Sequence, residues 1–506
     1  MSALPLLSLL VFTPWLGALV LASLGKKLGE KSARALGLLS SGSTLALALV
    51  ILANFAPAGA GYQFVERHSW ISALRVDYHL GLDGLSLLLV LLTGLVSPLC
   101  LLASWKIQRA PHHFAALFLL LQGAALGVFL ALDFFHWFLF WELSLVPAFF
   151  LIKIWGGAGA TRAAYQFVIY TLAGGACLLL AFAAIAVATG TFNFTGLATL
   201  AASGQLAAKL ALLGGLWPKV IFIGVFLGLA VKAPLFPFHT WLPATYAEAP
   251  SGVSMFLTGI MSKMGVYGFL RILWPLFPAE LHAAAPCLLG LALGGVVFGA
   301  FAALKQTDLK RMVAYSSINH VSYCLLALFA VAGASNAPAA TAAFSGALLQ
   351  MFNHGLSAAA LFACVGMLET RSGGRRCIHD FGGVRTVAPL FAGLCGVAMF
   401  SSLGLPGLNG FVGEFMIFSG VFGLAPWAAG VACLGLFATA LFLLTFWQRV
   451  FHGPTGAAVA TFRDLDRVEV FTLLPLVVLM VLLGVLPQLL VGLINPLVTT
   501  WVSQLP

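Results

Sequence analysis

Long apolar runs separated by short polar segments are the dominant pattern along this chain. An α-helix needs about 20 predominantly apolar residues to cross the hydrocarbon core of a membrane. The pattern therefore predicts an all-α polytopic membrane protein with about fourteen transmembrane helices. Their expected spans are 5–24, 35–55, 84–104, 115–133, 135–152, 165–189, 217–240, 251–274, 283–303, 312–332, 339–368, 388–421, 427–450 and 471–493.

The basic residues give the expected orientation. If the N-terminus lies outside, 18 of the 25 Lys and Arg residues fall in inside loops and 5, including Arg271, fall in outside loops. This bias follows the positive-inside rule. Both termini are therefore expected on the outer side, and the net charge of +10 needs no nucleic-acid partner. A bacterial inner membrane is the expected location, with an organellar membrane as the alternative. The first run has no basic residue before it, so it is not expected to be a cleaved signal peptide.

Composition excludes several classes of protein. Hydrophobic residues make up 61% of the chain and the mean hydropathy is +1.05, which excludes a soluble domain. The eight cysteines include no CxxC pair, and no glycine-rich phosphate loop is present in the sequence. We therefore expect this chain to bind no cofactor and no metal of its own.

Four ionisable residues lie deep inside predicted helices: Glu142, Lys232, Lys263 and Glu414. A charge at the bilayer centre costs roughly 2.5–3.5 kcal/mol on insertion scales, and such groups usually line an ion path or pair with each other. They therefore predict proton transport. Structural roles are the alternative for each residue: a hydrogen-bonded carboxylate at Glu142, lysines that bond broken-helix carbonyls, and a helix cap at Glu414.

Two segments predict interrupted helices at membrane depth. Pro234 and Pro237 follow Lys232, and the run 403–410 carries three glycines and a proline before Glu414. Irregular backbone survives at this depth only where protein buries it or it lines a water-filled cavity. Matched interruptions in two halves of a transporter point to its site. Together they predict two inverted five-helix repeats. The expected divisions are 1–114, 115–274, 283–450 and 451–506.

Histidines extend the candidate site. His320 and His354 also lie at depth, where they serve either as proton carriers, since histidine titrates near neutral pH, or as ordinary core residues. His239 and Glu248 lie toward the inside and are candidate proton-uptake groups or plain loop residues. Asp133 and His136 are expected to be solvated residues at the outer face.

Several stretches resemble the antiporter-like subunits of respiratory complex I, the NADH:quinone oxidoreductase. The resemblance covers about residues 75–455. Glutamate at position 414 is similar to the M type, called subunit 4 in mitochondria, whereas the L and N types usually carry lysine there. Ala244 departs from the pattern, which commonly has aspartate at that position. The motifs are Trp141-Glu142 with Pro147, 232–243, 248–250, 263–271, 315–320, 353–362 and 405–415.

This resemblance implies a role within a larger assembly. It implies that Lys232 is the central proton carrier, Glu142 its modulating partner, Lys263 the relay and Glu414 the outlet, with His320 and His354 between the last two. It also implies that L-type and N-type subunits are neighbours. NADH, FMN, iron–sulfur clusters and quinone are then expected in partner subunits, and no redox site in this chain.

Elementary electrostatics agrees with these roles. Burial disfavours the charged form of a lysine and a nearby carboxylate restores it, so a change in the Glu142–Lys232 separation would change how tightly Lys232 holds its proton. Three readings remain open: a proton-translocating subunit of NADH:quinone oxidoreductase, an Mrp-type cation/proton antiporter or membrane-hydrogenase subunit, and a non-transporting scaffold.

Overall fold

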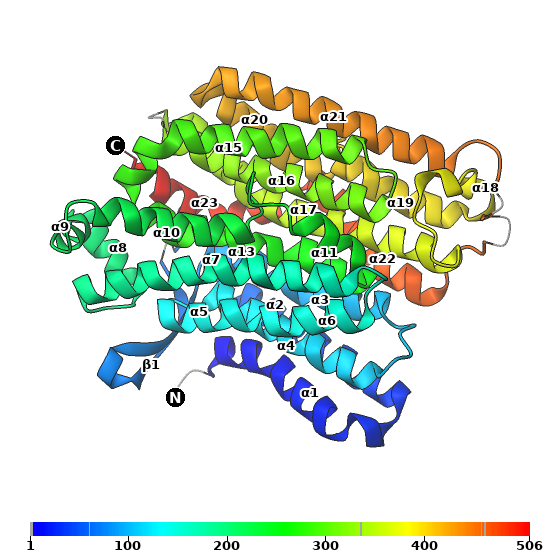
Figure 1. Cartoon of the computed structure of the whole chain (residues 1–506), viewed down its shortest axis with the longest axis horizontal. Helices are drawn as coiled ribbons and strands as arrows, with labels where there is room; N and C mark the ends of the chain where they lie inside the picture. The colour runs from blue at the N-terminus through cyan, green and yellow to red at the C-terminus, as the bar shows by residue number, and fades with distance from the viewer. Residues whose placement is uncertain (1–3, 60, 334–335, 457, 460–461, 506) are drawn as a thin grey trace.

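The computed structural model describes residues 4–59, 61–333, 336–456, 458–459 and 462–505. It is a bundle of helices whose axes run roughly along the long dimension of the molecule (Figure 1). Within the described residues, 12 helices are long and apolar enough to cross a membrane. They are α1 (Leu6–Leu28), α2 (Glu30–Asn54), α3 (Gly84–Ala103), α4 (Pro111–Leu130), α5–α6 (Phe134–Trp155), α7 (Ala160–Thr189), the composite helix Ser251–Leu276, α15 (Pro278–Leu304), α16 (Leu309–Ala332), α17 (Ala337–Arg371), α21 (Pro426–Phe451) and α22 (Arg467–Val485).

The two remaining predicted spans are the interrupted ones. The first consists of α10 (Trp217–Lys232) and, after a non-helical stretch, α11 (Leu242–Glu248). The second consists of α19 (Pro389–Ser402) and α20 (Asn409–Leu424). The prolines and glycines placed between these halves remove backbone donors or favour turns, as the sequence predicted. The all-α membrane architecture with two broken helices is thus confirmed, while the division into inverted repeats stays a prediction.

The last predicted span was wrong at its C-terminal end. The helix expected over 471–493 stops at Val485, and α23 (Gln488–Ser503) begins after Pro487. Proline has no backbone N–H and restricts the residue before it to extended conformations, so Leu486 and Pro487 separate the two helices. Another interruption lies at Ser144, where α5 (Phe134–Leu143) passes into α6 (Leu145–Trp155).

A β-hairpin on one end of the bundle was not predicted. The strands β1 (Gln63–Ile71) and β2 (Val76–Leu82) pair antiparallel, with Glu66 opposite Leu80. They are joined by the short helix η1 (Ser72–Leu74) and by Arg75 in a left-handed conformation with φ 54°. The hairpin lies at the same end as the small helices α8 (Phe194–Ala202) and α9 (Gln205–Ala211), and α1 begins and α23 ends there (Figure 1). The short elements η4 (Ile378–Asp380) and α18 (Val384–Val387) lie at the opposite end.

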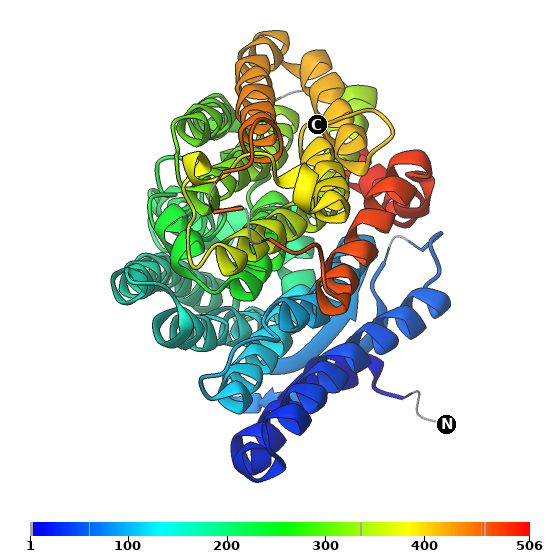
Figure 2. The same ribbon diagram turned by 90° about the vertical axis from the view of Figure 1, so that its right-hand side faces the viewer.

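Three helices form the centre of the bundle. The composite helix Ser251–Leu276, α16 and α17 are almost wholly buried, whereas α1 and α2 lie at one edge (Figure 2). The composite helix consists of α12 (Ser251–Phe256), the π-helical turn η2 (Leu257–Met261), α13 (Ser262–Gly268), a second π-helical turn η3 (Phe269–Leu273) and α14 (Trp274–Leu276). π-Helical turns occur frequently at functional sites. The central helices carry three of the predicted site residues: Lys263, His320 and His354.

Candidate functional site

Lys232 is the last residue of α10 and is buried at the first helix break. Its ammonium donates hydrogen bonds to the Trp141 carbonyl at 3.3 Å and to Ser144 Oγ at 3.1 Å, and it lies 4.5 Å from the centre of the Trp141 ring. The interruption of α5–α6 at Ser144 therefore provides the acceptors for Lys232. A cation at a helix C-terminus also interacts favourably with the helix dipole.

Glu142 is adjacent to these acceptors but does not bond Lys232. No hydrogen bond or ion pair joins the two side chains within the described residues, and the half-buried Glu142 Oε1 has no hydrogen-bond partner there. The carboxylate faces Gly175, where a Cβ would lie only 2.1 Å from Oε1. Lys232 thus contacts Trp141 and Ser144, the near neighbours of Glu142 in the chain, while the Glu142 carboxylate faces Gly175.

Lys263 lies at the middle of the composite helix and is buried. Its Nζ donates to the Thr258 carbonyl at 2.5 Å and to Ser262 Oγ at 3.3 Å, and it lies 2.6 Å from His354 Nδ1 on α17. Close approach of α13 to the first helix break is possible because residue 265 is glycine: a Cβ there would lie 2.3 Å from the Ala233 nitrogen. Within the described residues, no hydrogen bond joins Lys263 to Lys232.

His354, His320 and Glu414 continue directly from Lys263. The rings of His354 and His320 lie 5.2 Å apart, and His320 Nδ1 lies 3.1 Å from Glu414 Oε1, within ion-pair distance, although the ring is not oriented for a linear hydrogen bond. Gln350 Nε2 also donates to Glu414 Oε1, at 3.2 Å. We call Lys263, His354, His320 and Glu414 the central relay. It connects the composite helix to α17, α16 and α20, and all four side chains are buried.

The second helix break is held by amide side chains. Asn409, the first residue of α20, accepts from Asn353 Nδ2 through its carbonyl at 2.7 Å and donates to Asn353 Oδ1 at 3.2 Å. Its Oδ1 also accepts from Ser401 Oγ at 2.6 Å. These bonds satisfy backbone and side-chain groups that the interruption would otherwise leave unpaired in an apolar environment. Asn353 precedes His354, so the same bonds fix the relay histidine against α20.

The two candidate uptake groups lie in different surroundings. His239 is buried in the first break, with its ring 5.5 Å from Phe236 and 5.2 Å from Phe298, and its Nδ1 has no partner among the described residues. Glu248 ends α11; its carboxylate accepts from the Gly159 N–H at 2.9 Å and lies 3.5 Å from the Arg376 guanidinium. Glu248 also lines a cavity of about 410 Å³ that lies where α3, α6 and α17 end and α12 and α22 begin.

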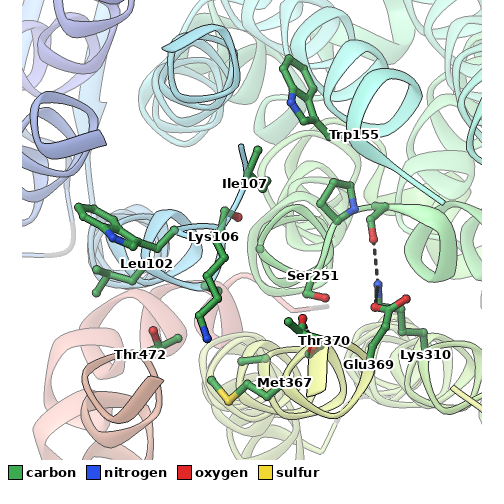
Figure 3. A pocket seen from close by; sticks show the side chains of 18 of the residues that line it. Leu102, Lys106, Ile107, Trp155, Ser251, Lys310, Met367, Glu369, Thr370 and Thr472 are labelled. Atoms are coloured by element: carbon green, nitrogen blue, oxygen red, sulfur yellow. Dashed lines mark hydrogen bonds and ion pairs between the residues drawn. The ribbon is translucent and has the colours of Figure 1, made fainter. Parts of the chain in front are cut away.

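Charged groups surround this cavity, which we call the charged cavity (Figure 3). Six ionisable side chains line it: Lys106, Glu248, Lys310, Glu369, Arg376 and Glu469. All three of these cations are paired: Lys106 contacts Glu469 at 3.2 Å, Lys310 contacts Glu369 at 2.7 Å, and Arg376 contacts Glu248 at 3.5 Å. By the distribution of Lys and Arg, this end of the bundle is the one expected on the inside.

Three sequence expectations about charged residues were wrong. Asp133 and His136 are buried, not solvated, because the β-hairpin and the residues around Asn193 cover this end of α5.

Arg271, counted among the outside loops, is buried in η3, where it forms an ion pair with Asp83 at 2.7 Å and donates to Tyr62 OH at 2.7 Å. Lys310, one of the 18 basic residues counted in inside loops, is also buried, at the start of α16. The alternation of apolar and polar runs contains no signal for such pairing.

Comparison with known proteins identifies the family. The family described as NADH:quinone oxidoreductase/Mrp antiporter matches residues 131–441, and the amino terminus of NADH-ubiquinone oxidoreductase chain 4 matches residues 38–132. NADH-quinone oxidoreductase subunit M of Rhodobacter capsulatus is 36% identical, with 99% of this chain and 96% of that protein covered. F(420)H(2) dehydrogenase subunit M of Methanosarcina mazei is also 36% identical, with 96% and 95% covered.

Solved structures agree with this match. A chain of respiratory complex I from Thermus thermophilus superimposes with a TM-score of 0.86 at 31% identity, covering 99% of this chain and 100% of that one. A chain of the Mrp complex from Dietzia superimposes with a TM-score of 0.84 at 21% identity, covering 100% and 98%, which shows a shared fold alone. The chain belongs to the NADH:quinone oxidoreductase/Mrp antiporter family, and within it to the M type that the sequence motifs indicated.

Proposed function

We propose that this chain is the proton-translocating membrane-arm subunit M of a complex I-type oxidoreductase, and that redox chemistry in other subunits drives it. The central relay carries this proposal: four buried ionisable side chains, contributed by four helix segments, stand in consecutive contact from Lys263 to Glu414. Such groups are expensive at membrane depth, and a scaffold has no need of them.

Protons are the ion that suits this arrangement. Amine and imidazole nitrogens accept and release protons, whereas alkali and alkaline-earth cations prefer oxygen ligands. A proton on Lys263 passes to His354, then to His320 and to the Glu414 carboxylate. Lys232, with Glu142 beside its acceptors, is the carrier proposed to supply Lys263. Its transfer requires the approach of α10 and α13, which Gly265 permits.

The direction of transport follows from the proposed orientation. Glu248 lies at the charged cavity and His239 lies in the first break, so both are proposed as groups that take up protons from the inside. Both termini then lie on the outer, periplasmic side of a bacterial inner membrane. L-type and N-type subunits are the proposed neighbours. The redox partners supply NADH oxidation and quinone reduction, although the similarity to an F(420)H(2) dehydrogenase subunit leaves another electron donor open.

The test compares Lys232→Ala with Lys219→Ala in membrane vesicles that contain the whole complex. Lys219 is an exposed residue at the other end of α10, so it removes the same charge from the same helix. We expect Lys232→Ala to assemble, as checked on a native gel, and to lose both quinone reductase activity and proton pumping. Lys219→Ala should keep both. Normal redox-driven pumping in assembled Lys232→Ala contradicts the proposed function of Lys232.

A further inference from the structure

Lys310 is a buried cation that the central relay does not use. It is the second residue of α16, is only 3% exposed, and contacts the Glu369 carboxylate at 2.7 Å. Its Nζ also donates to the Ala249 carbonyl at 3.2 Å. By contrast, the Lys106 side chain in the same cavity is 60% exposed. Figure 3 shows Lys310 and Glu369 side by side at one end of the charged cavity. Lys310 therefore lies between the cavity and the protein interior.

A row of hydroxyl groups begins at the backbone carbonyl to which Lys310 donates. The Ala249 carbonyl that accepts from Lys310 also lies 3.3 Å from Ser254 Oγ. Ser254, Thr258 and Ser262 follow one another at intervals of four residues, so they share one face of the composite helix. We call these three residues the hydroxyl row. All three are buried.

The hydroxyl row ends at Lys263. The Thr258 carbonyl accepts from Ser262 Oγ at 2.8 Å and from Lys263 Nζ at 2.5 Å, while Thr258 Oγ1 lies 2.7 Å from Ser317 Oγ on α16. Thr258 belongs to the π-helical turn η2, a deviation from α-helix that is often associated with function. The rise of four residues along a helix is about 6 Å, a separation that one water molecule bridges between hydroxyl groups.

We propose that Lys310 and the hydroxyl row form a proton inlet that loads Lys263 from the charged cavity. This inference rests on the proposed function and adds an uptake route to the same relay. The Lys310 ammonium releases one proton to the hydroxyl row, where each hydroxyl accepts a proton and donates its own. The neutral amine of Lys263 receives the proton and becomes an ammonium. Lys310, now a neutral amine, takes a proton from water in the cavity through the Glu369 carboxyl group.

Lys310→Arg tests the release of the proton. Arginine keeps the charge and the ion pair with Glu369, but a guanidinium does not give up its proton in proteins. A purely structural ion pair is therefore preserved by this substitution, whereas the inlet is blocked. We expect the assembled complex to lose most of its proton pumping, measured as quench of a pH-sensitive dye in vesicles, relative to quinone reduction. Lys106→Met is the control, because it changes an exposed cation of the same cavity, and it should pump normally.

Thr258→Val tests the hydroxyl row independently. Valine has nearly the shape of threonine but no hydroxyl group, and Thr258→Ser restores the hydroxyl. We expect pumping to be lost in the first variant and retained in the second. Thr93→Val is the matched control, since Thr93 is also buried and its hydroxyl group donates to the Leu89 carbonyl of its own helix. The comparison of Thr258→Val with Thr258→Ser tests the inlet even if Lys310→Arg does not assemble.

The results of these variants and of Lys263→Met distinguish failure of the inlet from failure of the proposed function. Normal pumping in Lys310→Arg or in Thr258→Val overturns the inlet. If Lys263→Met abolishes pumping in the same assay, the central relay still stands without the inlet. If Lys263→Met also pumps normally, the proposed function itself is wrong.

Discussion

Lys263 Nζ lies 2.6 Å from His354 Nδ1, although the two residues are 91 positions apart in the chain. The contact joins the composite helix to α17 at the centre of the bundle. An amine and an imidazole at this distance are joined by an N–H···N hydrogen bond. This contact is the reason that we propose His354 as the first acceptor after Lys263 in the central relay.

Replacing His354 by glutamine should stop pumping without preventing assembly. Glutamine still hydrogen-bonds Lys263 but does not carry a proton, and loss of a positioned acid–base group typically costs about 10²-fold or more in rate. Proton pumping and quinone reductase activity in vesicles are the measurement. His282→Gln is the control, because His282 contacts the Ala332 carbonyl outside the relay. Equal pumping in both variants contradicts the relay.

Glu414→Gln should also abolish pumping. The amide keeps the size of the side chain and a contact with Gln350, but it neither accepts a proton from His320 nor carries the charge that faces His320 at 3.1 Å. Glu414→Asp keeps a carboxylate and should retain part of the activity. The ratio of protons pumped to quinone reduced is the quantity to compare. A wild-type ratio in Glu414→Gln would show that Glu414 only caps or packs α20.

Asp83→Asn should destabilise the protein through the buried Arg271. The asparagine retains the helix cap that Asp83 provides to the Ser86 N–H, but it leaves the guanidinium of Arg271 without its ion-pair partner. Breaking a buried pair in this way typically costs about 3–5 kcal/mol. We expect a clear fall in the thermal unfolding temperature of the purified complex.

The exposed ion pair between Arg67 and Asp77 provides the comparison for Asp83→Asn. The Arg67 side chain is 57% exposed, and exposed pairs contribute only about 0–1 kcal/mol. Arg67→Ala should therefore leave the unfolding temperature almost unchanged. If the two substitutions have equal effects, the Asp83–Arg271 pair is not an important source of stability.

Asp133 makes stability depend on pH. Burial raises the pKa of its carboxyl group to about 6, so the folded protein holds a proton that the unfolded chain releases near its ordinary value of 3.8. A raised acid pKa means that this contribution to stability is complete below the unfolded pKa and is lost as the pH rises toward 6. Asp133→Asn retains the cap on the Phe135 N–H and removes the ionisation.

The variant should therefore unfold at a higher temperature than wild type above pH 6, and the difference should vanish below pH 4. Thermal unfolding of both proteins across this range is the measurement. Parallel pH profiles would mean that the Asp133 carboxyl group is not perturbed by its surroundings.

The membrane class, the approximate helix spans and the places of the four ionisable residues within those spans follow from the amino-acid sequence alone. They do so because the membrane acts on local composition: each run must be apolar and long enough to cross, and each charge within a run stands out. Prolines and glycines also act locally, so both helix breaks around Lys232 and before Glu414 were predictable. The resemblance of the motifs then led to the correct family.

Which of these side chains meet depends on how the helices pack in three dimensions. Lys263 contacts His354 and His320 faces Glu414, whereas Glu142 and Lys232 are neighbours without a direct bond. Lys310 and Arg271 were assigned to loops, yet both are buried and paired. The physical reason is that hydropathy is a property of one segment at a time, whereas a contact between side chains depends on how distant helices pack, rotate and approach one another.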